Sequence, residues 1–224
     1  GAAAERAGRR QLSWYEAEEA AGRVTIVRNL ADLDSEVTPR LILLMECADP
    51  IKTPQEVPWR TERGLRVVGL SWAMGSRYAG GNARPGGLSG DGESLVDALE
   101  EHGVGHDVSH LSPAAFDDLL ARPPGPVCAT HSNAAAITGP NDRHLRDDQI
   151  LAIADRDGVI GLNLFGRFLR GDDKPATVED CLDHIEHVAA SQAGIESEWG
   201  PMRMGALEPH RFRKDSVTSD DWTD

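Results

Sequence analysis

Hydrophobic and polar positions along the chain follow a pattern that predicts strands alternating with helices. Apolar, β-branched runs predict strands at residues 23–27, 41–46, 65–71, 104–109, 126–132 and 158–165, and several of them are continuously apolar, which is typical of strands covered on both faces of a parallel sheet. Stretches with a helical period, most of them ending at Gly or Pro, occupy residues 9–22, 92–103, 112–123, 146–158 and 177–194. Strands and helices at this spacing indicate βαβ units and an α/β fold.

Two segments interrupt this alternation. The glycine-rich stretch 73–92 follows the third predicted strand and is predicted to be a long loop. From Glu196 onward the sequence shows no clear period. Residues 196–224 are therefore predicted to be an irregular C-terminal segment of the same domain that residues 1–195 form.

Charge and composition narrow the classes of partner. A formal charge of −14 and only 5% aromatic residues argue against a nucleic-acid partner, because phosphates are repelled and bases find few stacking surfaces. The longest apolar runs are too short to span a bilayer. The three cysteines, Cys47, Cys128 and Cys181, are too widely spaced for a disulfide framework. This favours reduced thiols and a cytoplasmic location.

Polar side chains stand where several predicted strands end. Glu46 follows the second strand, His110 follows the fourth, and His131 lies in the fifth run, "PVCATHS". In a βα barrel these ends meet at one face, so a carboxylate and two imidazoles could converge there as ligands of zinc or a similar divalent ion. The competing interpretation is that each histidine is a structural or surface residue, and spacing alone does not separate the two.

Five segments together resemble the renal (membrane) dipeptidase family, a family of zinc-dependent hydrolases. They are "LILLMECADPI", "GLSGDGESLVDALEEHGVGHDVSHLS", "PVCATHSNAAAI", "NDRHLRDDQILAIADRDGVIGLNLF" and "TVEDCLDHIEHV", and they follow the family's order over roughly residues 11–194. The resemblance implies a TIM-like (β/α)8 barrel. It also implies cleavage of dipeptides by a zinc-activated water, one or two zinc ions, and a homodimer.

The resemblance also implies roles for particular residues. Glu46 matches a carboxylate that bridges two zinc ions, and His110 and His131 match the two imidazoles of the second zinc. Arg143 matches the residue that grips the substrate's carboxylate, a task that suits a planar guanidinium. From its position before His110, Asp107 is either an acceptor for an imidazole N–H or a capping residue.

The chain departs from the family pattern at several places. The family's first-strand His-x-Asp and its late Gly-Ser-Asp are absent, and Ser71-Trp72 replaces a Thr-His pair whose His contacts substrate. Trp72 thereby becomes a candidate substrate-binding residue. Three explanations stay open: a sequence that lacks an upstream strand and a C-terminal part, a degenerate relative, or a divergent hydrolase with one metal.

These departures predict weak or absent dipeptidase activity for the chain as written. The alternative function is that of a non-catalytic barrel that binds a small acidic ligand. Its cleft would be lined by Trp72, Arg77 and Arg143. Metal content and dipeptide turnover would distinguish the two functions.

Overall fold

The computed structural model describes residues 1–122 and 125–199. Within the chain, Gly1–Gln192 forms one compact unit. Of the predicted irregular segment 196–224, residues 200–224 lie outside the described part. Residues 196–199 instead continue the last helix.

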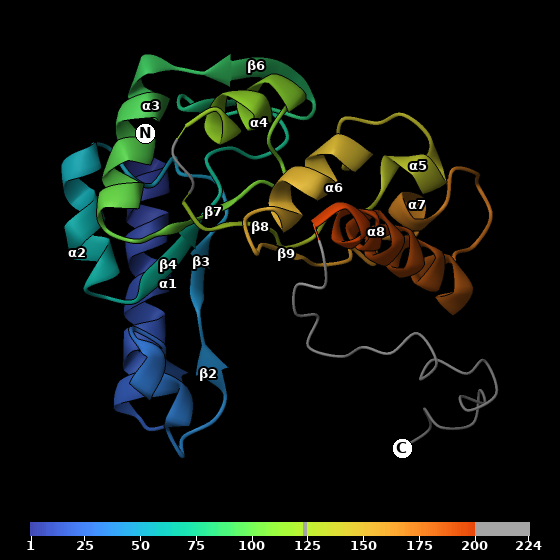
Figure 1. Ribbon diagram of the computed structural model, residues 1–224. Helices are drawn as coiled ribbons and strands as arrows, with labels where there is room; N and C mark the ends of the chain where they lie inside the picture. The colour runs from blue at the N-terminus through green and yellow to red at the C-terminus, as the bar shows by residue number, and fades with distance from the viewer. Residues whose placement is uncertain (123–124, 200–224) are drawn as a thin grey trace. The chain divides into compact units, whose positions relative to one another are not determined.

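Five parallel strands form the central sheet of the described residues, in the order in which they occur along the chain (Figure 1). They are β3 (Leu43–Met45), β4 (Leu65–Val68), β7 (Gly105–Asp107), β8 (Val127–Ala129) and β9 (Val159–Ile160). Consecutive strands are neighbours and all pairs are parallel, which is the arrangement of strands in the wall of a TIM-like barrel. The carboxyl ends of these strands consequently lie along one edge of the sheet.

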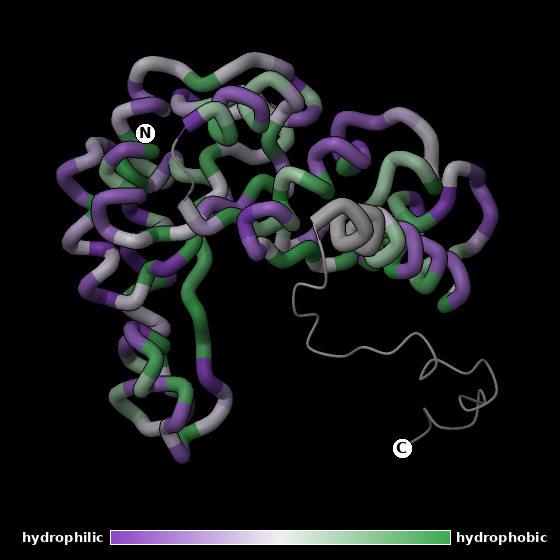
Figure 2. Tube along the Cα trace, viewed as in Figure 1, coloured by the Kyte–Doolittle hydropathy of each residue, from purple (hydrophilic) through white to green (hydrophobic). Residues whose placement is uncertain are grey.

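The first predicted strand does not join this sheet. It forms β1 (Thr25–Ile26), which pairs in parallel with β2 (Arg40–Leu41) in a separate two-stranded sheet. The predicted run 41–46 is accordingly divided between β2 and β3. This segment is hydrophobic along much of its length (Figure 2), and the side chains of Ile42 and Leu44 remain partly exposed.

The glycine-rich stretch 73–92 is not the loop predicted from its composition. It contains an antiparallel hairpin of β5 (Ala79–Gly81) and β6 (Arg84–Leu88). Glycine allows this hairpin to pack backbone against backbone: a Cβ on Gly81 would lie only 2.1 Å from the carbonyl oxygen of Trp72. The glycines therefore indicate close packing here, not only conformational freedom.

Helices connect the strands. The described helices are α1 (Ala2–Ala20), α2 (Val57–Thr61), α3 (Gly90–Glu101), α4 (Pro113–Leu120), α5 (Ala135–Thr138), α6 (Asp147–Ala154), α7 (Gly166–Leu169) and α8 (Val178–Trp199), with 3₁₀ turns at Leu30–Asp34 and Pro54–Glu56. Of these, α3, α4 and α6 each bury one face. The predicted start of α4 is confirmed, because Ser112 Oγ accepts a hydrogen bond from the N–H of Ala115 and Pro113 occupies the first turn.

The core lies between the sheet and these helices. Leu95 and Leu99 of α3, Phe116 and Leu119 of α4, and Ile150 of α6 are buried in one hydrophobic cluster. Val68, Val127 and Ala129 provide its sheet side. This packing fixes the strands, and with them the positions of the residues that follow each strand.

Candidate metal centre

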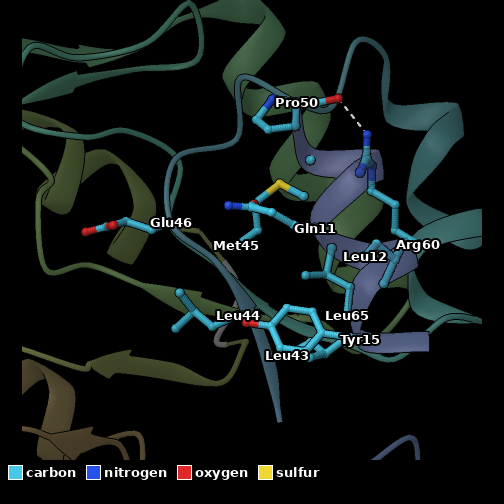
Figure 3. Close-up of a pocket in the computed structure, with 11 residues that line it drawn as sticks. Gln11, Leu12, Tyr15, Leu43, Leu44, Met45, Glu46, Pro50, Arg60 and Leu65 are labelled. Atoms are coloured by element: carbon cyan, nitrogen blue, oxygen red, sulfur yellow. Dashed lines mark hydrogen bonds between the residues drawn. The ribbon is translucent and has the colours of Figure 1, made fainter. Parts of the chain in front are cut away.

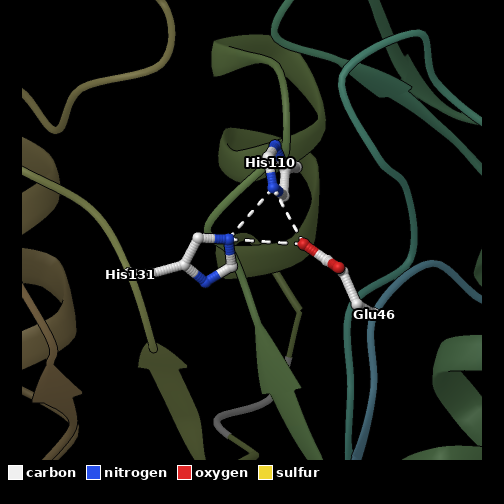
Figure 4. Close-up of side chains that lie close together, drawn as sticks. All are labelled: Glu46, His110 and His131. Carbon is white, nitrogen blue, oxygen red and sulfur yellow. Dashed lines mark hydrogen bonds and ion pairs between the residues drawn. The ribbon is translucent and has the colours of Figure 1, made fainter. Parts of the chain in front are cut away.

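Three ligand-type side chains converge at the carboxyl edge of the sheet (Figure 4). Glu46 directly follows β3, while His110 and His131 follow β7 and β8. The Nε2 atom of His110 lies 3.0 Å from Glu46 Oε1, and that of His131 lies 3.4 Å from the same oxygen. The two Nε2 atoms are 3.0 Å apart. The structure thus brings together the three residues that were predicted as ligands.

The ring nitrogen of His110 that does not face Glu46 has a hydrogen-bond partner of its own. His110 Nδ1 lies 3.2 Å from Asn82 Oδ1, and an amide oxygen can only accept a hydrogen bond. In the tautomer that this contact favours, Nδ1 carries the hydrogen and Nε2 carries the lone pair. Burial, with smaller contributions from Arg143 and His131 that outweigh the opposing effect of Glu46, lowers the pKa of His110 to about 4, so the ring is neutral near pH 7.

His131 is oriented by a chain of two hydrogen bonds. The hydroxyl of Thr130 donates to Asp107 Oδ2 at 2.6 Å, so its oxygen accepts from His131 Nδ1 at 2.8 Å. In a neutral ring, this places the lone pair of His131 on Nε2. Asp107 therefore reaches the imidazole through Thr130 and not directly. It also accepts from Ser109, as a capping residue would.

The three converging atoms fit a metal ion better than they fit one another. With these tautomers, Glu46 Oε1 and both Nε2 atoms are acceptors, and no donor lies among them. Tetrahedral zinc with Zn–N and Zn–O bonds of about 2.0–2.1 Å would place its ligand atoms about 3.3 Å apart. The observed separations of 3.0 to 3.4 Å are close to that value. A divalent cation would satisfy all three acceptors at once.

Arg143 is buried and contacts the backbone next to this cluster. Nη1 donates to the carbonyl oxygen of Ser109 at 2.6 Å and to Ser132 Oγ at 3.0 Å, and Nη2 donates to the carbonyl oxygen of His131 at 2.6 Å. It thereby ties the segment after β7 to the segment after β8. Both terminal nitrogens already have partners, which differs from the substrate-gripping role that the resemblance implies; that role stays a prediction.

Trp72 forms one side of the site. Its ring centroid lies 5.7 Å from that of His110, and 52% of the residue is exposed. Arg77, the other arginine expected in an acid-binding cleft, donates to the carbonyls of Ile51 and Lys52.

A cavity of about 300 Å³ lies beside β3. It is lined by α1 and β3 residues and by the buried Arg60. Figure 3 shows Glu46 pointing away from the other lining side chains, so its carboxylate belongs to the metal-ligand cluster and not to this cavity.

Two residues of the centre were not predicted from the sequence. Asn82 lies in the stretch that was predicted as a loop, and nothing in its neighbourhood distinguishes it from other turn residues. Thr130 directly precedes His131, and a hydroxyl next to a candidate ligand was the one local signal that could have revealed its role.

Sequential parallel strands and a carboxylate–imidazole cluster at their carboxyl ends define a TIM-like α/β protein with a candidate metal centre. A family model described as membrane dipeptidase (peptidase family M19) matches residues 9–197. The chain therefore belongs to the membrane dipeptidase family.

Individual relatives agree with this membership. An uncharacterized protein from the PQQ-III 3' region of Acinetobacter calcoaceticus is 30% identical over 193 residues, which cover 81% of this chain and 61% of that protein. The dipeptidase aclJ of Aspergillus oryzae is 31% identical over 153 residues, covering 64% of this chain and 36% of aclJ. The chain thus spans less than two thirds of the length of these curated relatives.

A solved structure shares the fold. A metallo peptidase from Rhodobacter sphaeroides, liganded with a phosphinate mimic of the dipeptide L-Ala-D-Ala, superimposes with a TM-score of 0.72 at 30% identity. The match covers 81% of this chain and 56% of that one. Among the described residues, no helix is long and apolar enough to cross a membrane.

Proposed function

We propose that the chain holds one zinc ion at Glu46, His110 and His131 and serves the hydrolysis of dipeptides. The observation that carries this proposal is the convergence of three ligand-type atoms that lie 3.0 to 3.4 Å apart. Family membership supports the reaction class, and the phosphinate dipeptide mimic bound to the Rhodobacter relative supports a dipeptide substrate. One ion is proposed because the described residues contain a single group of three such ligands.

The chain's own residues have distinct tasks in this proposal. Glu46 contributes the anionic ligand, and because its side chain is 48% exposed, the cluster stays open to substrate. The two histidines contribute neutral ligands whose rings are held from the far side by Asn82 and Thr130. Trp72 would offer an apolar surface to one substrate side chain. When bound, zinc supplies a Lewis acid that polarises a carbonyl and activates water.

Zinc content and dipeptide turnover test this function together. Purified, untagged protein is expected to contain about one zinc per chain by elemental mass spectrometry, and His131→Ala is expected to lose it. His102→Ala, at an exposed position that ends α3, is the matched control and should keep its zinc. Unchanged zinc in His131→Ala would refute the ligand assignment, and no zinc in the wild type after addition of the metal would refute the metallohydrolase.

Turnover gives the second measurement. Without the first-strand His-x-Asp and the late Gly-Ser-Asp, hydrolysis of a dipeptide such as L-Ala-D-Ala is expected to be weak in this chain. Zinc-dependent turnover that His131→Ala abolishes would support the enzyme, whereas zinc binding without turnover would favour the non-catalytic barrel. The cytoplasmic location and the homodimer stay predictions from the sequence.

A further inference from the structure

The turn of the β5–β6 hairpin lies against His110 with two groups of one residue. The backbone N–H of Asn82 donates to the carbonyl oxygen of His110 at 3.0 Å, and Asn82 Oδ1 lies 3.2 Å from His110 Nδ1. The first contact holds the main chain at His110. The second contact is made to the ring itself, at Nδ1, the nitrogen that does not face Glu46. Asn82 therefore contacts both parts of this candidate ligand.

The hairpin is anchored firmly enough for the turn to act as a fixed support. The N–H of Ala83 donates to the carbonyl oxygen of Ala73 at 2.8 Å, and that of Ser112 donates to the carbonyl oxygen of Gly80 at 3.2 Å. Gly81 forms an antiparallel bridge with Leu111. On the second strand of the hairpin, β6, the N–H of Leu88 donates to Asp118 Oδ2 of α4 at 2.9 Å.

We propose that Asn82 is a positioning residue that sets the tautomer and orientation of His110 for metal binding. Its amide oxygen accepts Nδ1–H, which places the lone pair on Nε2, beside Glu46 and His131. An accepting partner on the far nitrogen is the general means by which a metal-ligating histidine is aligned. The effect on metal affinity rests on the proposed zinc site, whereas the effect on the ring exists in the metal-free protein.

Two readouts separate the inference from the function on which it rests. The tautomer of His110 in the metal-free protein is read from two-bond ¹H–¹⁵N correlation spectra, with the resonances assigned by their absence in His110→Gln. Zinc affinity is measured by competition with a chromogenic chelator. The variants are Asn82→Ala, which removes the acceptor, and Asn82→Asp, which keeps one. Ala83→Ser, at the exposed neighbouring position of the same turn, is the matched control.

In the wild type we expect hydrogen on Nδ1 of His110. Asn82→Ala should move the ring toward the Nε2–H form and weaken zinc binding roughly 10- to 100-fold. Asn82→Asp should keep the Nδ1–H form and bind zinc at least as tightly as the wild type, and Ala83→Ser should match the wild type in both measurements. Because Asn82→Asp retains the acceptor, it serves as the test if Asn82→Ala does not fold.

Two results would overturn the inference: an Nε2–H ring in the wild-type protein, or an Nδ1–H ring in folded Asn82→Ala. An Nε2–H ring in folded Asn82→Asp would do the same. If the tautomer responds as expected in a protein that binds no zinc, the proposed function fails, whereas the effect of Asn82 on the His110 ring stands. If the wild type binds zinc and Asn82→Ala changes neither readout, the function stands and the inference fails.

Discussion

β7 carries two histidines in contrasting surroundings, one within the strand and one just beyond its end. His106 is in register with Val68 and Val127 and is 1% exposed. Neither of its ring nitrogens has a hydrogen-bond partner in the described part of the chain, and the Glu100 carboxylate lies 3.8 Å from Nε2. His110 instead has Asn82 Oδ1 beside Nδ1, and it has Glu46 Oε1 and His131 Nε2 beside Nε2.

The comparison shows that a perturbed pKa does not by itself identify a functional histidine. Burial lowers the pKa of both rings to about 4, with a charged arginine adding to the effect in each case: Arg122 for His106 and Arg143 for His110. The two rings differ in what surrounds the nitrogens. Of the two, only His110 has a ring nitrogen within a group of three ligand-type side chains, so only His110 is placed to bind a cation.

Replacing each histidine by leucine tests the comparison most strongly. His110→Leu should weaken zinc binding by more than the roughly 100-fold expected for loss of an orienting partner, because a ligand itself is removed. His106→Leu should leave zinc affinity unchanged, since a buried apolar side chain suits that position. Competition with a chelator measures the zinc affinity of both variants. Equal losses of affinity would contradict the distinction between His106 and His110.

Replacing Arg143 tests whether its hydrogen bonds hold the segments after β7 and β8 together. Arg143→Leu should lower the free energy of unfolding by about 2 kcal/mol, because it leaves the carbonyls of Ser109 and His131 without this donor. It should also weaken zinc binding. Urea denaturation and chelator competition provide the two measurements.

Arg156 supplies the matched control for that variant. It also donates to two backbone carbonyls, those of Ala152 and Leu120, but none of its bonds involves the metal-ligand cluster. Arg156→Leu should therefore lose stability and keep its zinc affinity. A raised KM for dipeptide in Arg143→Leu, with stability and zinc affinity both unchanged, would instead support the substrate-gripping role.

The smallest expected effect is a pH dependence carried by His106. Its pKa is about 4 in the folded protein and near the ordinary value of 6.5 when unfolded, so on acidification the unfolded chain takes up a proton first. The contribution to stability is present above pH 6.5 and is lost as the pH falls toward 4. Between pH 7.5 and 5.5 this loss amounts to about 1 kcal/mol.

His106→Leu should reduce the pH dependence by that amount in urea titrations at the two pH values. The variant need not abolish it, because burial also lowers the pKa of His144 to about 4. If the difference in the free energy of unfolding between pH 7.5 and 5.5 is the same in His106→Leu as in the wild type, burial does not keep His106 neutral. The comparison of His106 with His110 would then no longer hold for the pKa.

Local signals in the sequence predicted much of the framework. The runs 65–71, 104–109, 126–132 and 158–165 each contain a strand of the sheet, and Ser112 with Pro113 marks the start of α4. The prediction for 73–92 was wrong, because a glycine-rich composition does not reveal whether a segment is free or packed backbone against backbone. The close approach of Gly81 to Trp72 depends on contacts outside the local sequence.

By itself, the sequence determined which ligand-type residues follow the strands and where most of the strands and long helices lie. Strand period, helix caps and stop signals act over a few residues, so they can be read locally. The tertiary structure decided which nitrogen of each imidazole faces the cluster, where Arg143 donates, and that Asn82 belongs to the site. Asn82 and His110 are 28 positions apart and Glu46 and His110 are 64 apart, and only the pairing of the strands and the docking of the hairpin bring these partners within hydrogen-bond distance.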